Sequence, residues 1–268
     1  IGLTLGLVEA ADAAMRRHYY SLAPERDSAQ RVVLVGADEQ TLEQWGPPPY
    51  SAEQLETLTS EIAVGEPSAV GLVGQERFSS ATGEQLGEIS GRTQLVVGND
   101  LDTWSNVPAP VEALPVPPGS SVGALIGATA LAPPTDGALP VHYLVPAKRL
   151  PMVPASRVAS GDIPANTFRG KIVVIGVTAP DAVTPVQTPI GPLATAQVEA
   201  HALLGLSDGR VWKTPSTLAR WGICAALVFA LLLVLRRLST RWAVAATIVA
   251  VLAIVAIDFG LFVSGTVA

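Results

Sequence analysis

Five short apolar runs along the chain each end in a glycine that is followed by a small or polar residue. The runs consist almost entirely of Val, Ile, Leu and Ala, which is typical of strands buried on both faces of a mostly parallel sheet. They are RVVLVGADE (31–39), AVGLVGQE (69–76), QLVVGND (94–100), GALIGATAL (123–131) and KIVVIGVTAP (171–180). We expect KIVVI to form a central strand beside RVVLV.

Helical spacing of apolar residues separates several of these runs. SAEQLETLTSEIA (51–63) starts with Ser51 as a candidate N-cap, and ATAQVEAHALLGL (194–206) places its apolar side chains on one stripe. SSATGEQLGEIS (79–90) gives a weaker helical signal. Alternating strands and helices predict a Rossmann-like α/β domain with a mainly parallel sheet, which we assign to residues 24–215.

One part of this domain breaks the parallel pattern. PPTDG and then ALPVHYLVP follow the run at 123–131, which suggests an antiparallel excursion, a hairpin that turns at Asp136 and Gly137. The Pro-rich stretch 108–118 is expected to be a loop or a polyproline II edge.

The C-terminal part of the chain has the pattern of membrane helices. WGICAALVFALLLVL (221–235) and WAVAATIVAVLAIVAI (242–257) carry no charge and account for the positive mean hydropathy of +0.40. With their flanks, the runs extend to 216–235 and 242–263, about the 20 residues that cross a bilayer. We predict two transmembrane helices; a buried helical hairpin in a soluble core is the alternative.

Arginines set the orientation of this hairpin. Arg236, Arg237 and Arg241 crowd the loop 236–241, and clustered arginines in a short loop mark the cytoplasmic side. Residues 24–215 are then extracytoplasmic. Residues 1–23 are expected to hold the end of a further transmembrane helix and a juxtamembrane helix, with a signal peptide as the alternative. The chain starts within an apolar run without an initiator Met and stops where the last predicted membrane helix ends, so we expect it to be part of a longer protein.

Two charges lie within the predicted spans, Arg220 and Asp258. Arg220 precedes Arg236 by 16 residues and Asp258 follows Trp242 by 16, so both are expected at similar depth near the outer edge of the bilayer. They either form a transmembrane charge pair or reach the headgroups separately.

Composition excludes several functions. The net charge is −6 and the arginines concentrate at the membrane, so nucleic acid is not an expected partner. The single cysteine, Cys224, lies within a predicted span and forms no disulfide in the outer domain. His18, His142 and His201 are scattered, and no metal-ligand spacing, phosphate loop or nucleophile elbow is present. We therefore predict no metal, no cofactor and no catalysis for this segment.

The best candidate site is a polar crevice at the carboxyl ends of the strands, where ligands bind in such sheets. The alternative is that these residues merely form strand-to-loop turns. His201, on the last helix, either senses pH or is a helix residue satisfied by a neighbour. The candidate residues are Asp38, Glu39, Asn99, Asp100, Thr178 and His201. Gly176 supplies one glycine of a dinucleotide fingerprint, which argues against a nucleotide; we expect it to permit a tight turn after its strand.

Several segments resemble one family. IPANTFRGKIVVIGVTA (163–179), the TPIG loop (188–191) and the helix QVEAHAL (197–203) are similar to the signature of the second type of CHASE domain. LVEAADAAMRR (7–17) resembles its juxtamembrane acid–acid–base spacing. The chain departs from the family at GPPPY (46–50), which lacks the usual Trp and Arg, and at its second strand, which lacks the usual acid.

The resemblance implies the extracellular sensory module of a bacterial inner-membrane receptor whose effector is a cyclase or a Ser/Thr or His kinase. Expected partners are membrane lipid, another copy or other membrane proteins, and an unknown small extracellular ligand. A ligand-free scaffold or accessory subunit of a membrane complex is the alternative from a different functional class.

Overall fold

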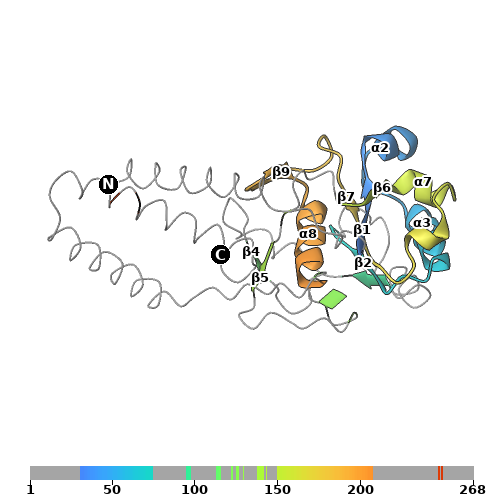
Figure 1. The fold of residues 1–268 in the computed structure, drawn as a ribbon. Coiled ribbons are helices and arrows are strands. Elements are labelled where there is room, and N and C mark those ends of the chain that lie inside the picture. Colours follow the sequence, from blue (N-terminus) through green and yellow to red (C-terminus); the bar gives the residue numbers. More distant parts are fainter. Residues whose placement is uncertain are drawn as a thin grey trace. The chain divides into compact units, whose positions relative to one another are not determined.

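The structure is a computed structural model, and it divides the chain into two compact units, residues 1–209 and 210–268. The helices and strands labelled in Figure 1 belong to the first unit. The structure describes residues 31–74, 95–97, 113–115, 138–141 and 150–207, together with residues 122, 125, 126, 129, 143, 247 and 249.

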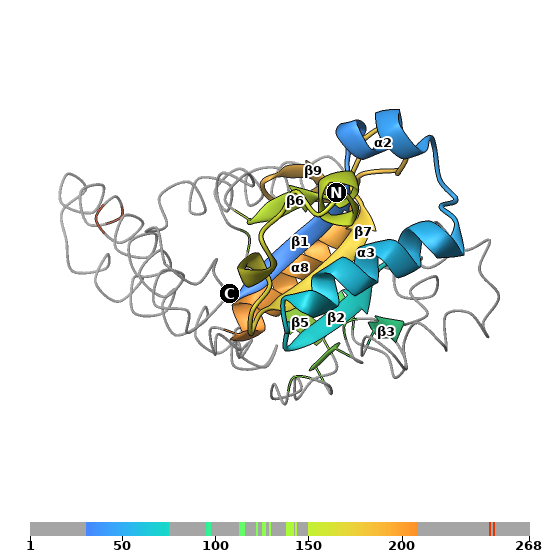
Figure 2. The same cartoon turned by 90° about the vertical axis from the view of Figure 1, so that its right-hand side faces the viewer.

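Five parallel strands form the main sheet, in the order β3-β2-β7-β1-β6 (Figure 1; all five are labelled in Figure 2). Their bounds are β1 Val32–Ala37, β2 Ala69–Leu72, β3 Leu95–Val97, β6 Met152–Pro154 and β7 Ile172–Val177. The prediction that β7 is central and lies beside β1 is confirmed, because β7 pairs with β1 on one side and with β2 on the other. Every residue of β1 and β7 is buried, as expected for strands without a polar face.

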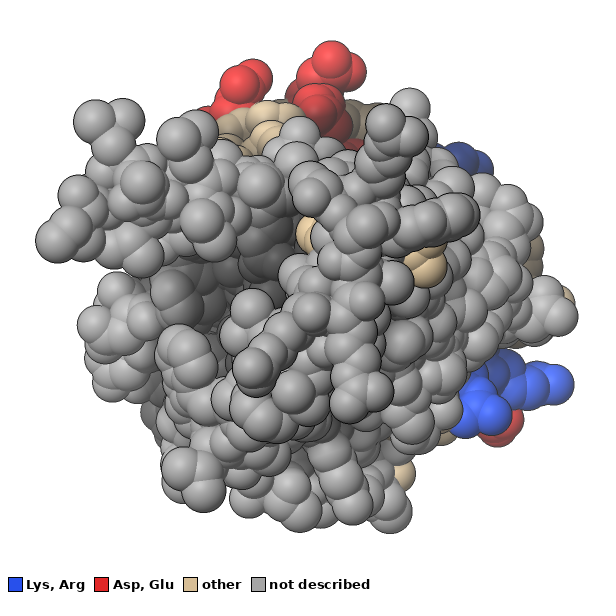
Figure 3. Space-filling view, turned by 60° about the vertical axis from the view of Figure 1, so that its left-hand side comes forward, with Lys and Arg blue, Asp and Glu red and all other residues tan. Residues whose placement is uncertain are grey.

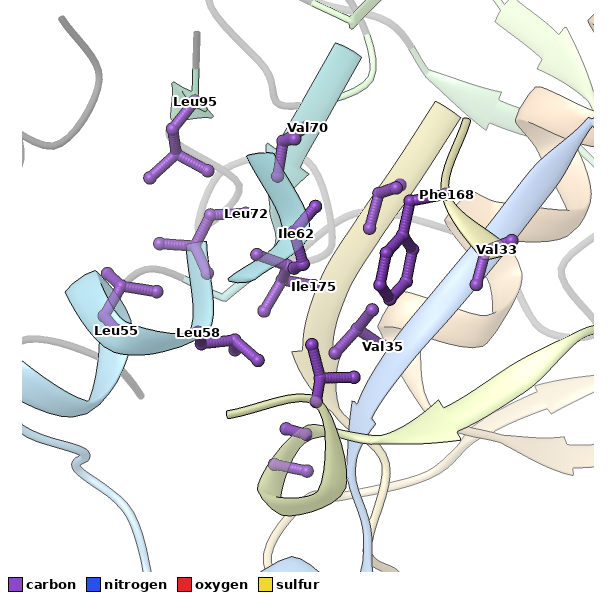
Figure 4. Close-up of a cluster of buried hydrophobic side chains, with 14 of the residues drawn as sticks. Val33, Val35, Leu55, Leu58, Ile62, Val70, Leu72, Leu95, Phe168 and Ile175 are labelled. Atoms are coloured by element: carbon purple, nitrogen blue, oxygen red, sulfur yellow. The ribbon is translucent and has the colours of Figure 1, made fainter. Parts of the chain in front are cut away.

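One face of the sheet is covered by α3 (Ala52–Val64) and α7 (Ala155–Ala159). Ser51 caps α3 as predicted: its hydroxyl accepts a hydrogen bond from the N–H of Gln54 (3.2 Å), and the Gln54 side chain accepts from the N–H of Ser51 (2.8 Å). The apolar side chains of α3 meet those of the strands, as Figure 4 shows. This cluster includes Leu55, Leu58, Ile62, Val33, Val35, Val70, Leu72, Ile175 and Phe168.

The opposite face is covered by α8 (Thr195–Ser207), which contacts β1 and β7. Figure 2 shows α3 in front of the strands and α8 behind them. A Cβ atom on Gly176 would lie 2.3 Å from the Cβ of Ala196 in α8. Our explanation of Gly176 as a turn residue is therefore wrong: it lies within β7 and lets the helix approach the sheet closely.

The predicted strand at 123–131 is also wrong. Val122, Leu125 and Ile126 are helical, and a Cβ on Gly71 would lie 2.3 Å from the Leu125 side chain, so this turn packs on β2. An antiparallel excursion does exist, but its partner differs. β5 (Ala138–Pro140) pairs with β4 (Ala113–Pro115), within the stretch expected to be a loop or polyproline II edge.

The remaining elements are short. They are α2 (Glu39–Trp45), the 3-10 helix η4 (Ala165–Thr167), and the antiparallel strands β8 (Val186–Thr188) and β9 (Gly191–Leu193). The GPPPY turn ahead of α3 contains a cis peptide bond between Pro48 and Pro49. Neither β6 nor the β8–β9 pair was predicted, because these short strands contain proline or polar residues in place of an uninterrupted apolar run.

Candidate functional site

The carboxyl ends of β1 and β7 lie side by side. The N–H groups of Thr178 and Ala179 both donate to the carbonyl of Ala37, at 3.0 and 3.1 Å. The chain leaves β1 toward α2 and α3, whereas it leaves β7 toward α8 on the other face. Neighbouring strands whose connections leave on opposite faces create the point where open α/β sheets bind ligands. Two predicted site residues, Asp38 and Thr178, are brought together there.

Asp38 is the N-cap of α2. Its carboxylate oxygen Oδ1 accepts hydrogen bonds from the N–H and the hydroxyl of Thr41, both at 3.0 Å. The Thr41 hydroxyl oxygen in turn accepts from the N–H of Ser156 in α7, at 3.3 Å. Thr41 and Ser156 are almost fully buried. The Asp38 carboxylate therefore connects the end of β1 to α2 directly and to α7 through the Thr41 hydroxyl, so it has a structural role.

Tyr50 is a neighbour that sequence reasoning did not select. It is buried, and its ring meets that of Trp45 edge-on at 5.5 Å. Burial, and then the negative charge of Asp38, raise the pKa of its phenol from 10.0 to about 12, so the side chain stays neutral. In the sequence, the only indication of a role for Tyr50 is that an aromatic residue ends the Pro-rich turn GPPPY (46–50).

Thr178 and Glu39 differ in exposure at this edge. Glu39 occupies the first turn of α2 and is exposed. Thr178 is only 9% exposed, and its hydroxyl lies over Gly36, where a Cβ would come within 2.6 Å of it. Among the described residues, no hydrogen-bond partner satisfies this hydroxyl.

His201 lies away from this edge. Ala196, five residues earlier in α8, packs over Gly176 near the end of β7, which places His201 about 7.5 Å further along the helix. Its Nδ1 is 2.6 Å from the carbonyl of Gln197, and its ring lies 5.6 Å from that of Tyr143. Burial lowers the pKa of His201 from 6.5 to about 4, against the opposing hydrogen bond to Gln197. The described members of the predicted set therefore do not form one site: Asp38 and Thr178 lie together at the ends of the strands, whereas His201 lies further along α8.

The other predicted residues lie outside the described part of the chain. These are Asn99, Asp100, Arg220 and Asp258, together with the predicted membrane helices 216–235 and 242–263 apart from residues 247 and 249. Where the structure describes the chain, no helix combines the length and the hydropathy needed to cross a bilayer. The same residues contain no group of three or more His, Cys, Asp or Glu side chains arranged to hold a metal ion.

Among the described residues visible in Figure 3, most of the Asp and Glu side chains lie at the top of the view, and most of the Lys and Arg side chains lie at the lower right, next to one acidic side chain. One surface ion pair joins Arg169 and Glu66 at 3.9 Å, with both side chains more than two-thirds exposed. A pair this exposed contributes little to stability.

Comparison with known families decides the classification. Residues 92–236 match the CHASE2 domain, which is 145 of the 268 residues. The chain belongs to the CHASE2 domain family. No curated protein and no solved structure shows significant similarity to it. CHASE2 is a family of extracellular sensory domains, which is consistent with a sensory role for this chain.

Proposed function

We propose that the chain is the input module of a bacterial membrane signalling receptor. In this proposal residues 24–215 sense a condition outside the inner membrane. The helices 216–235 and 242–263 carry the signal to a cyclase or kinase effector that lies outside this segment. The observation that supports it best is the extent of the CHASE2 match. It spans β7 and α8, continues through the apolar run 221–235, and ends at Arg236, where the arginine-rich loop begins.

The packing of α8 suits a transmitting element. The helix is held on the sheet by the Gly176–Ala196 contact near its start. Near its end, the guanidinium of Arg31 donates to the carbonyl of Ser207 at 2.7 Å, where a cation complements the helix dipole. Eight residues, 208–215, separate Ser207 from the first predicted membrane helix. A shift of α8 against the sheet would therefore reach the membrane through a short connection.

Ligand binding would act on this helix by shifting a conformational equilibrium. A stimulus that favours one position of α8 over another changes the populations only by its difference in affinity for the two states. The β1–β7 edge is the first place to look for such a stimulus, because the Thr178 hydroxyl there is buried and has no partner among the described residues.

A ligand-free scaffold or accessory subunit of a membrane complex is the second candidate. It is favoured by the use of Asp38 within the fold, since its carboxylate caps α2 and connects it to α7 through Thr41. A polar edge that serves only packing needs no ligand. Stoichiometric copurification with a larger membrane assembly, and no effector on the same polypeptide, would support this alternative.

Two measurements test the sensory proposal. In a Cys224→Ala background, an impermeant thiol reagent should label Thr57→Cys, which is exposed on α3, in intact cells. It should label Ser239→Cys only after permeabilisation; the reverse pattern would refute the proposed orientation. The second measurement joins the chain to a reporter cyclase domain. Unfolding the outer domain by Val174→Asp should change cyclase output several-fold at equal membrane abundance, whereas unchanged output would favour the scaffold.

A further inference from the structure

Helix α8 is buried on two opposite sides. Ala196 faces β7, and the helix also contacts β1 and β5. His201 is five residues after Ala196, about 140° around the helix, so it faces away from the sheet. There its ring meets Tyr143, which follows β5 in the chain. We call β5 and Tyr143 the outer layer; the helix is enclosed between it and the sheet.

The protonation state of His201 follows from its contacts. A carbonyl only accepts hydrogen bonds, so the Nδ1 of His201 must carry the hydrogen that it donates to Gln197 at 2.6 Å. The lone pair is then on Nε2, which is buried and has no partner among the described residues. His201 itself is 1% exposed. A proton added at Nε2 would create a buried charge that no described acceptor stabilises.

The ionisable groups that the structure describes around α8 do not change this conclusion. Strands β1, β7 and β5 contain no ionisable side chain, and Tyr143 presents its ring. Glu199 is two positions from His201 and therefore faces another side of the helix. Arg31 binds the last turn, about 9 Å further along, and its positive charge opposes protonation of His201.

We propose that α8 is a proton-operated latch, in which protonation of His201 at acidic pH separates α8 from the outer layer formed by β5 and Tyr143. The buried ring is compatible only with the neutral imidazole, so the charged form requires the helix to move or open until Nε2 reaches water. The further interpretation that acidification is the stimulus which the receptor senses rests on the proposed function. The latch itself is a property of the fold and is measured separately.

The response should occur between the pKa of the released histidine, about 6.5, and that of the latched one, about 4. Above this window both forms are neutral and the latch is unaffected. As the pH falls through it, only the released form binds a proton, so release is favoured. Linkage gives an increase of about 30-fold in the opening constant at pH 5 relative to pH 7.5.

Hydrogen–deuterium exchange of the full 268-residue chain in lipid nanodiscs tests the latch. After correction for intrinsic exchange, residues 195–207 should open about 30-fold more at pH 5 than at pH 7.5. In the same protein, α3 should be unchanged. His201→Asn retains a donor for the Gln197 carbonyl but does not titrate, so it should abolish the response. His18→Gln and His142→Gln are the matched controls and should retain it.

Two results would overturn the latch: no acid-induced opening of α8 in the native chain, or an equal response in His201→Asn. If that variant loses α3 protection at pH 7.5, histidine NMR of the native chain decides instead. His201 should then remain neutral until α8 opens, and titration near 6.5 with α8 still protected would refute the proposal. The thiol-labelling test is independent of the exchange measurement. If acid opens α8 but labelling places the domain on the cytoplasmic side, the proposed sensory role is refuted and the latch is retained.

Discussion

Gly36 of β1 and Gly176 of β7 are paired directly opposite each other, on the face of the sheet that carries α8. Thr178 fills the space above Gly36, and Ala196 fills the space above Gly176; an added Cβ would lie 2.6 Å from the Thr178 hydroxyl and 2.3 Å from the Ala196 Cβ. Because neither strand position has room for a side chain, this pair sets how closely the first turn of α8 approaches the carboxyl edge.

Replacing Gly176 tests this close approach. Gly176→Ala places a methyl group against Ala196, so helix and sheet must separate, at a cost of about 1–3 kcal/mol in the free energy of unfolding. Urea denaturation followed by proteolysis of the outer domain measures the loss.

The matched partner is Ala196→Gly, which removes the opposing methyl group. In the double variant the penalty of Gly176→Ala should fall by at least half, a coupling that a double-mutant cycle isolates. Additive effects of the two substitutions would show that α8 does not bear on Gly176 as described.

Val174 provides a second test, of the centre of the sheet. It lies in β7 between Leu34 of β1 and Gly71 of β2, and it is 0% exposed. Val174→Asp buries a carboxylate without a partner and costs several kcal/mol, enough to unfold a domain of ordinary stability. Val64→Asp, at a position 67% exposed, is the matched control and should cost less than about 1 kcal/mol. Protease resistance of the Val174 variant would contradict the central position of the strand.

The central strands were predictable because their pattern has a single interpretation. Uninterrupted Val and Ile in β1 and β7 require burial on both faces, and only a strand inside a parallel sheet meets that requirement. The Ser51 cap was predictable for a similar reason, since the residues that form a capping box are only three positions apart in the sequence.

Leu125 shows where this reasoning failed. An apolar run of four to eight residues fits a buried strand or a buried helical turn equally well, and the packing on Gly71 decides between them. Such a contact joins residues more than 50 positions apart, so local periodicity does not contain it.

The candidate site was predicted only in part, because some of its neighbours follow from the sheet topology and others depend on contacts distant in sequence. The ends of parallel strands meet at one edge, which brought Asp38 and Thr178 together as expected. The position of His201 depends on how far along α8 the helix contacts the sheet, and this is fixed by Ala196 and Gly176. Tyr50 was missed because its proximity to Asp38 arises only from the path of the Pro-rich turn.

The capping box at the start of α3 offers a local stability test. Ser51→Ala leaves the N–H of Gln54 without its side-chain acceptor and should cost about 1 kcal/mol. Ser60→Ala, at an exposed position inside the same helix, is the control and should have little effect or a slightly stabilising one. Equal losses for the two variants in urea denaturation would mean that the cap contributes nothing specific.

Asp38 separates the structural from the ligand-binding interpretation of the carboxyl edge. Asparagine caps helices about as well as aspartate, so Asp38→Asn should leave the free energy of unfolding nearly unchanged, whereas Asp38→Ala should lose about 1 kcal/mol. If the carboxylate also binds a ligand, Asp38→Asn should alter the output of the reporter cyclase in spite of its normal stability. Unaltered output from a stable Asp38→Asn variant would assign the residue to packing alone.

The phenol of Tyr50 reports on the same carboxylate without reference to any ligand. Its pKa of about 12 arises mainly from burial and secondarily from the charge of Asp38, so both Asp38 variants should lower it while leaving it above 10. Because the folded state holds this proton more tightly than the unfolded chain, the native domain loses stability as the pH rises from 10 toward 12. Absorbance at the tyrosinate band, taken as the difference from Tyr50→Phe, gives the titration. An unchanged Tyr50 titration in Asp38→Asn would show that the carboxylate does not act on the phenol, and the described geometry of this edge would then be wrong.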